Sequence, residues 1–227
     1  MKFNNFAVLI LFYSVYLISE DIPPYSAIYN FESEEISISG KREFLKTDSG
    51  YEIKFKASNL IASLFFSSRF KILNNEVIPN EYEVRVRPKF LKRDQNLVFN
   101  YDEKKISSVG VNEWNINMNE TISYDPLNVQ IMIRKNVKKG LSGFNFNIID
   151  MEKGVSKLYT FDLIGNEKCI FENEMLNCFI LVRTSEDSDR KVTYFLAKEL
   201  EYMFVKIIDS SPERVNKLEL KELLSLG

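Results

Sequence analysis

The sequence predicts a mainly β protein: a single curved antiparallel sheet, barrel-like or sandwich-like, with one central α-helix and an N-terminal signal helix. Polar and apolar side chains alternate strictly over residues 52–57 and 81–87. Such alternation is typical of strands with one buried and one solvated face. Turn-forming residues recur at short intervals, and only one segment carries clear helix-boundary residues.

The N-terminal segment has the pattern of a signal peptide. Lys2 precedes an apolar run over residues 6–18, in which Ser14 is the only polar residue. The run is shorter than the roughly 20 residues that a membrane-spanning helix needs. Cleavage after Ser19 would leave one exported β-rich domain over residues 20–227, without a membrane contact of its own. The alternatives are an uncleaved membrane anchor and a buried core strand.

About ten short strands are expected in the exported domain. Asp48-Ser49-Gly50, Asn74-Asn75 and residues 102–105 supply turns between some of them. The strand candidates are residues 25–32, 36–46, 52–57, 69–73, 81–87, 97–101, 157–163, 179–184, 191–197, 204–208 and 218–224.

One helix is expected between Asp125 and Gly140. Asp125 is a favourable N-cap, Pro126 suits the first helical position, and Gly140 can end the helix. Leu127 and Ile131 would share its buried face.

A second helix, or a lid, is the hypothesis for the apolar residues 60–66. If the curved sheet encloses an apolar groove, this segment would cover a hydrophobic ligand. The alternative is that its side chains fill the core of the sheet. The candidate lid residues are Leu60, Ile61, Leu64, Phe65 and Phe66.

Composition excludes several functions. The net charge of −2 provides no basic surface for nucleic acid. Histidine is absent, which removes Ser-His-Asp and Cys-His catalysis and His-ligated metals. Two cysteines are too few for a four-thiolate site. We therefore predict no catalytic residue, no metal site and no cofactor.

The two cysteines, Cys169 and Cys178, flank a turn-like Glu172-Asn173-Glu174 stretch. Two strands folding about this turn would bring the thiols almost opposite each other, close enough for a disulfide. The alternatives are two buried free thiols and a redox pair, although the spacing is not C-x-x-C.

The chain resembles the bacterial exported family DUF3108. Phe195 stands where that family usually has Trp, and Met203-Phe204 replaces Leu-Pro. The resemblance implies a periplasmic or secreted β-rich protein of unknown function, and it carries no catalytic residues over. It rests on Tyr25-Ser26-Ala27-Ile28-Tyr29, Asp125-Pro126-Leu127, Asp189-Arg190, Tyr194-Phe195-Leu196-Ala197 and Tyr202-Met203-Phe204-Val205.

Arg183 and Arg190 form a candidate anion-binding pair. The structural alternative is that Arg190 pairs with a nearby carboxylate, such as Glu167 or Asp187.

Three functions compete. The first is a periplasmic binding module for a lipid or another amphiphile of the envelope. The second is a structural or assembly protein of the envelope, which would hold a protein partner at a sheet edge or an aromatic patch. The third is a glycan hydrolase with two carboxylates, which the sequence disfavours because it places no two acids together.

Overall fold

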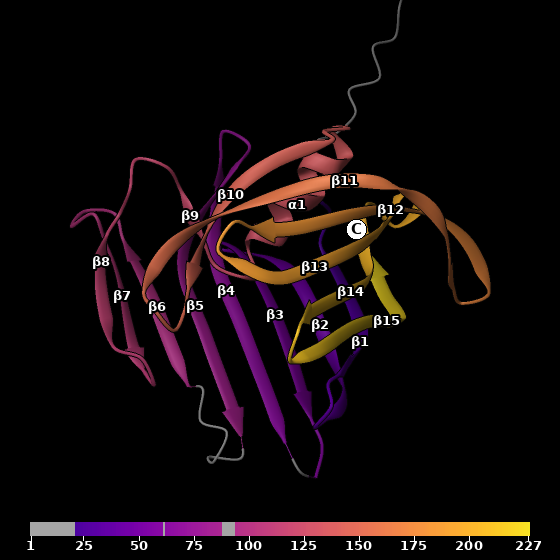
Figure 1. Ribbon diagram of the computed structural model, residues 1–227, viewed down its shortest axis with the longest axis horizontal. Coiled ribbons are helices and arrows are strands. Elements are labelled where there is room, and N and C mark those ends of the chain that lie inside the picture. Colours follow the sequence, from indigo (N-terminus) through magenta and orange to yellow (C-terminus); the bar gives the residue numbers. More distant parts are fainter. Residues whose placement is uncertain (1–20, 61, 88–93) are drawn as a thin grey trace, which may run out of the picture.

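Fifteen strands of the described residues form one sheet around one α-helix (Figure 1). The computed structural model describes residues 21–60, 62–87 and 94–227, so the expected signal segment lies outside the described residues. The prediction of a mainly β fold with a single curved sheet and a central helix is confirmed.

The strands and the helix follow one another along the chain. They are β1 Tyr25–Glu32, β2 Ser37–Thr47, β3 Gly50–Ser58, β4 Ser63–Leu73, β5 Glu76–Arg87, β6 Gln95–Asn100, β7 Lys105–Gly110, β8 Trp114–Asn117, β9 Ser123–Tyr124, α1 Val129–Lys138, β10 Gly143–Asp150, β11 Val155–Phe171, β12 Glu174–Ser185, β13 Ser188–Ala197, β14 Met203–Ser211 and β15 Arg214–Leu226.

The first and the last strand are neighbours in the middle of the sheet. β1 pairs antiparallel with β15, and the sheet runs outward from this pair to edge strands β8 and β9. Every pairing is antiparallel except that of β9 with β10, which is parallel. The open edges therefore come from the middle of the sequence, not from its ends.

The two edges approach each other without pairing. Residues 118–122 cross from β8 to β9, and we call this crossing the seam. The backbone oxygen of Met151, in the β10–β11 turn, accepts hydrogen bonds from Gln95 Nε2 at 2.6 Å and from Trp114 Nε1 at 3.1 Å. Side-chain hydrogen bonds thus hold the two ends of the sheet together where a closed barrel would have a strand ladder.

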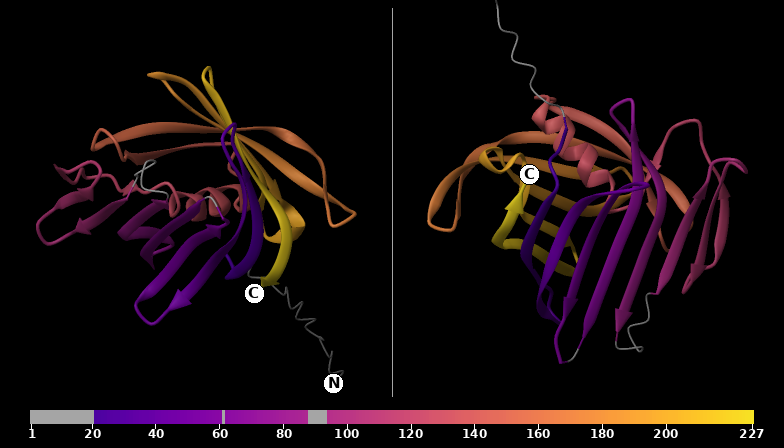
Figure 2. Two further views of the ribbon diagram at one scale, coloured as in Figure 1. Left: turned by 90° about the horizontal axis from the view of Figure 1, so that it is seen from below. Right: turned by 180° about the vertical axis from the view of Figure 1, so that it is seen from behind.

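The helix α1 lies between the β1–β5 half and the β10–β14 half of the sheet (Figure 2). Its Val129, Ile131, Ile133 and Val137 are buried in the main core. The predicted helix is confirmed, but its regular part begins at Val129, because a helical turn over residues 126–128 precedes it. The helix fills the concave face that the curvature of the sheet creates.

The segment predicted as a helix or lid is largely strand β4, so the helical prediction is wrong. Leu64 and Phe66 pack against the core, whereas Phe65 lies on the opposite face under the Arg85 guanidinium, 4.3 Å from its ring centroid. Successive side chains of a strand point to opposite faces, so Phe65 lies on the other face of β4 from Leu64 and Phe66. Leu60 is fully exposed in the loop before β4, and Ile61 lies outside the described residues.

The predicted disulfide between Cys169 and Cys178 is confirmed, with the two Cα atoms 5.9 Å apart. The cysteines are diagonal rather than opposite, because Cys169 faces Leu176 in the ladder. A two-residue turn at Glu172-Asn173, with positive φ at both residues, sets this register. The bond lies at the base of the hairpin's projecting end, because Cys178 still pairs with Ala197 of β13. Beyond it the β11–β12 hairpin projects past the rest of the sheet (Figure 1).

A substitution at Gly154 tests the contact between the β10–β11 turn and Trp114, which joins the two ends of the sheet. It has φ +63°, and a Cβ there would lie 2.5 Å from the Trp114 ring. Gly140 also has a positive φ, of +79°, but has open space around it. We expect Gly140→Ala to lower the free energy of unfolding by about 1 kcal/mol. Gly154→Ala should cost about 1–3 kcal/mol more, because the Trp114 ring must move. Urea titrations measure both losses. An equal loss of unfolding free energy in the two variants would contradict a tight contact between Gly154 and Trp114.

Candidate functional site

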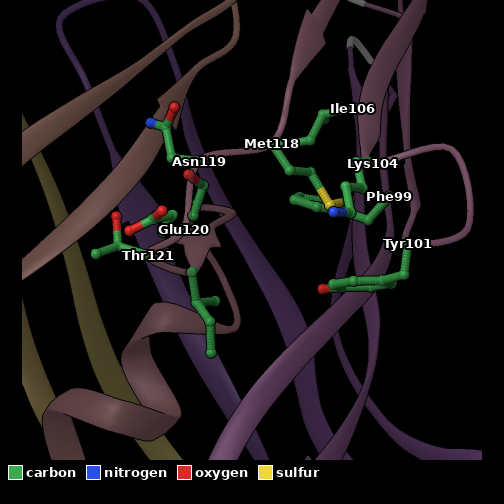
Figure 3. Close-up of a pocket in the computed structure, with 10 residues that line it drawn as sticks. Phe99, Tyr101, Lys104, Ile106, Met118, Asn119, Glu120 and Thr121 are labelled. Carbon is green, nitrogen blue, oxygen red and sulfur yellow. The ribbon is translucent and has the colours of Figure 1, made fainter.

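A pocket of about 360 Å³ opens at the seam (Figure 3). One wall comes from β6, β7 and the turn between them, and the other comes from the crossing segment. Asn119, Glu120 and Thr121 lie across the hollow from Phe99, Tyr101 and Lys104. The lining residues are Phe99, Tyr101, Lys104, Ile106, Met118, Asn119, Glu120, Thr121, Ile122 and Ser123.

The floor of the pocket is apolar. Phe99 and Ile106 face each other across the β6–β7 ladder, and both belong to the second, smaller hydrophobic cluster. Met118 packs against the same cluster from the crossing segment. Phe99 shares its face of β6 with the buried Leu97, and Ile106 shares its face of β7 with the buried Ser108, because alternate residues of a strand lie on one face.

Hydrogen bonds hold both walls of the pocket in place. The Met118 amide donates to the Lys104 carbonyl at 2.8 Å, which ties the crossing segment to the β6–β7 turn. Asn147 Nδ2 of β10 donates to Thr121 Oγ1, also at 2.8 Å. The Tyr101 hydroxyl donates to the Pro79 carbonyl at 2.9 Å, and burial raises the pKa of Tyr101 to about 12. The crossing segment is thus anchored to both edges of the sheet.

The charges of the lining lie at its rim. Among the described residues, Lys104 is its only cation and Glu120 its only carboxylate. Both residues are exposed to solvent. The site therefore combines an apolar interior with one charge of each sign at the mouth, and it offers no pair of acids for acid–base catalysis.

A buried carboxyl fixes the chain where it leaves the pocket. Asp125 Oδ1 accepts hydrogen bonds from the backbone amides of Leu127 and Asn128 at 2.8 and 2.9 Å. Its Oδ2 accepts from Ser68 Oγ of β4 at 2.6 Å and from the Asn128 side chain. Burial raises the pKa of Asp125 to about 7, although these hydrogen bonds act to lower it.

The pocket does not include the sequence-predicted site residues. Arg190 forms a two-pronged ion pair with Asp209, not with Glu167 or Asp187. Arg183 lies over the Tyr159 ring, 4.6 Å from its centroid. The ion pair leaves Arg190 neutralised, so the structure supports the structural alternative over an open anion-binding pair. The described lid candidates, Leu60, Leu64, Phe65 and Phe66, are not in the lining either.

The sequence does not reveal the residues that form the pocket, because the pattern of apolar and polar residues that marks them is short. Met118 and Ile122 bracket the polar Asn119-Glu120-Thr121, a pattern that resembles any surface loop. Only the three-dimensional proximity of the two sheet edges turns this loop into a wall.

Comparison with solved structures finds a similar fold. The crystal structure of a β-barrel-like protein of the domain of unknown function DUF1849 from Brucella abortus matches with a TM-score of 0.55. The identity is 9%, and the match covers 91% of this chain and 98% of that chain. Models of known protein families and the curated proteins give no match. The resemblance to DUF3108 therefore stays a prediction.

In residues 21–60, 62–87 and 94–227, no helix is long and apolar enough to cross a membrane. In the same residues, no group of three or more Cys, Asp or Glu side chains is arranged to hold a metal ion.

Asp125 predicts a pH dependence of stability. Its pKa is raised from 3.8 to about 7, so the folded protein keeps a proton that the unfolded chain releases near pH 4. The stabilisation from this group is complete below that pH and is lost as the pH rises to about 7. The difference in unfolding free energy between wild type and Asp125→Asn should then fall by up to about 1.4 kcal/mol per pH unit and level off above pH 7.

The measurement is a series of urea titrations followed by the fluorescence of Trp114, the single tryptophan. A difference that rises with pH would show that the four donors keep Asp125 ionised, and would contradict the prediction.

Proposed function

We propose that this protein is an exported binding module of the bacterial envelope, which takes part of a small amphiphile into the seam pocket. The observation that carries the proposal is the pocket itself, with its apolar floor and charged rim. Its volume of about 360 Å³ falls at the small end of the usual range for ligand pockets. It would therefore hold a short chain or a ring rather than a whole lipid.

Binding accounts for the lining better than catalysis does. Phe99, Ile106, Met118 and Ile122 provide surface that an apolar group would cover. Lys104 and Glu120 can orient a polar head without a reaction. A glycan hydrolase would need a second carboxylate near Glu120, and the lining has none among the residues that the structure describes.

The export part of the proposal rests on different features. The disulfide between Cys169 and Cys178 is the kind of bond that persists in oxidising compartments such as the periplasm. The signal-like pattern of residues 1–19 and the resemblance to DUF3108 agree with that location. These three features are independent of the pocket.

An uncharged fluorescent probe tests the pocket. Thr121 is exposed at its wall, and Thr160 is exposed on β11, outside the lining. We expect N-phenyl-1-naphthylamine to bind the wild type, and Thr121→Trp to weaken binding about tenfold or more because the new ring fills the hollow. Thr160→Trp is the matched control and should bind like the wild type.

The experiment must distinguish binding in the pocket from nonspecific binding of the probe to apolar surface. If the wild type leaves the fluorescence of the probe unchanged, or if both tryptophan variants lose binding equally, the seam is not the binding site.

A second function, the binding of a protein partner in envelope assembly, is favoured by one observation. Ile170 and Met175 face each other near the tip of the β11–β12 hairpin and are 79% and 67% exposed. The nearby disulfide stiffens this projecting hairpin. Exposed apolar pairs on a stiff hairpin are suited to a protein contact.

A photo-crosslinking amino acid at Ile170 tests this alternative in the intact bacterium. The same amino acid at Thr160 is the control. A single dominant crosslinked species from position 170, absent from position 160, is the expected result for an assembly protein. Identical crosslinking patterns from the two positions would contradict it.

A further inference from the structure

Two arginines lie completely inside the fold, outside the lining of the seam pocket. Arg42 of β2 is 2% exposed and Arg134 of α1 is 1% exposed. Arg42 lies opposite Ala27 in the β1–β2 ladder, and Ala27 has Tyr25 and Tyr29 as its neighbours on the same face of β1. The Arg42 guanidinium lies 5.5 Å from the Tyr29 ring centroid, and that of Arg134 lies 5.1 Å from the Tyr25 ring centroid. Both charges therefore lie over one row of β1 side chains.

Among the described residues, the hydrogen-bond partners of the two guanidiniums are uncharged groups. Arg42 Nη2 donates to the side-chain oxygen of Gln130, and Arg134 Nη2 donates to the Glu201 carbonyl at 2.9 Å. The Glu201 carboxylate instead pairs with Lys138 at 2.8 Å. Among residues 21–60, 62–87 and 94–227, no carboxylate forms an ion pair with either arginine.

Three nitrogen donors of this pair have no hydrogen-bond partner in the part of the chain that the structure describes. They are Arg42 Nε, Arg134 Nε and Arg134 Nη1, and all are inaccessible to solvent. A buried charge is costly unless an opposite charge or hydrogen bonds compensate it. Burial lowers the pKa of Arg134 only to about 10, so the guanidinium keeps its charge at neutral pH. Aromatic faces offset part of the cost but leave the N–H edges unused.

The chemistry of the unused donors is suited to an anion. The guanidinium is the side chain that best matches carboxylate and phosphate, because its planar N–H groups donate two parallel hydrogen bonds. Gln130 and Arg134 are four residues apart and share the face of α1 that meets Arg42.

We propose that a carboxylate or phosphate group binds between α1 and strands β1 and β2, held by the unused donors of Arg42 and Arg134. This internal anion site is separate from the seam pocket, whose lining contains neither arginine. The anionic group could be a free ion or the head of an amphiphile, and both sources present the same oxygen atoms.

Calorimetric titration of the purified protein tests the proposal with three probes: inorganic phosphate, decanoate and uncharged 1-decanol. The variants are Arg134→Gln and Arg42→Gln. Arg85→Gln is the matched control, because Arg85 also lies over a ring but on the exposed face of β5. We expect both buried-site variants to raise the Kd of the anion about tenfold or more. Arg85→Gln should leave it unchanged.

The probes separate the two sources of the anion. Phosphate binding that depends on both arginines supports a free ion. Decanoate binding that is tighter than phosphate binding, with the same dependence, supports an amphiphile head. Absence of wild-type binding to both anions, or an equal loss in Arg85→Gln, would overturn the proposal. Binding of 1-decanol as tight as that of decanoate would overturn it too, because the charge would then play no part.

Thermal unfolding shows whether a variant that binds no anion is still folded, and it tests the proposal independently of the titration. Removal of an uncompensated buried charge should leave Arg134→Gln at least as stable as the anion-free wild type. Phosphate should raise the Tm of the wild type and leave that of Arg134→Gln unchanged. A large loss of Tm in anion-free Arg134→Gln would show that Arg134 is already compensated, and would overturn the proposal.

Discussion

The hydrogen bonds of the buried Asp125 carboxyl fix the helix inside the curve of the sheet. They join Ser68 of β4 to the turn that leads into α1, so one group sets where the chain leaves the sheet edge and where the helix begins. With the helix seated on the concave face, the β1–β5 and β10–β14 halves have a common core. The same placement leaves the two sheet edges apart at the seam, and the pocket lies there.

The order of strands explains why the opening lies in the middle of the sequence. The N- and C-terminal strands pair at the centre of the sheet, where the Gly227 amide also donates to the Pro24 carbonyl at 2.9 Å. The sheet then has to end at β8 and β9. β8 is only four residues long and β9 only two, so neither offers a long edge for aggregation. A similar fold occurs in a β-barrel-like protein at only 9% identity. This fits a fold that depends on the alternation of polar and apolar residues and on the order of the hairpins, more than on particular residues.

The sequence predicts local features of this fold well and long-range ones poorly. Alternation identified β1 to its exact bounds and most later strands, and the cysteine spacing about a turn identified the disulfide. Strands β7, β8, β9 and β10 were missed. β8 and β10 carry Asn at alternate positions, which looks like loop sequence. The run 60–66 looked like a helix because β4 has apolar side chains on both faces.

The buried arginine pair and the seam pocket also depend on long-range contacts that the sequence does not show. Arg42 lies in a run of charged residues, Lys41-Arg42-Glu43, and only the β2 register shows that it points inward while its neighbours do not. Met118 and Ile122 look like loop residues until β8 and β9 are placed. Arg183 and Arg190 looked like a pair in the sequence, yet the ladder gives Arg190 a partner, Asp209, from the next strand.

Native mass spectrometry of the protein, purified gently from the cells that naturally produce it, tests whether this fold binds an amphiphile. We expect a complex heavier than the polypeptide, whose extra mass disappears after extraction with organic solvent. A single mass equal to that of the polypeptide before extraction, unchanged when an amphiphile is added back, would contradict it.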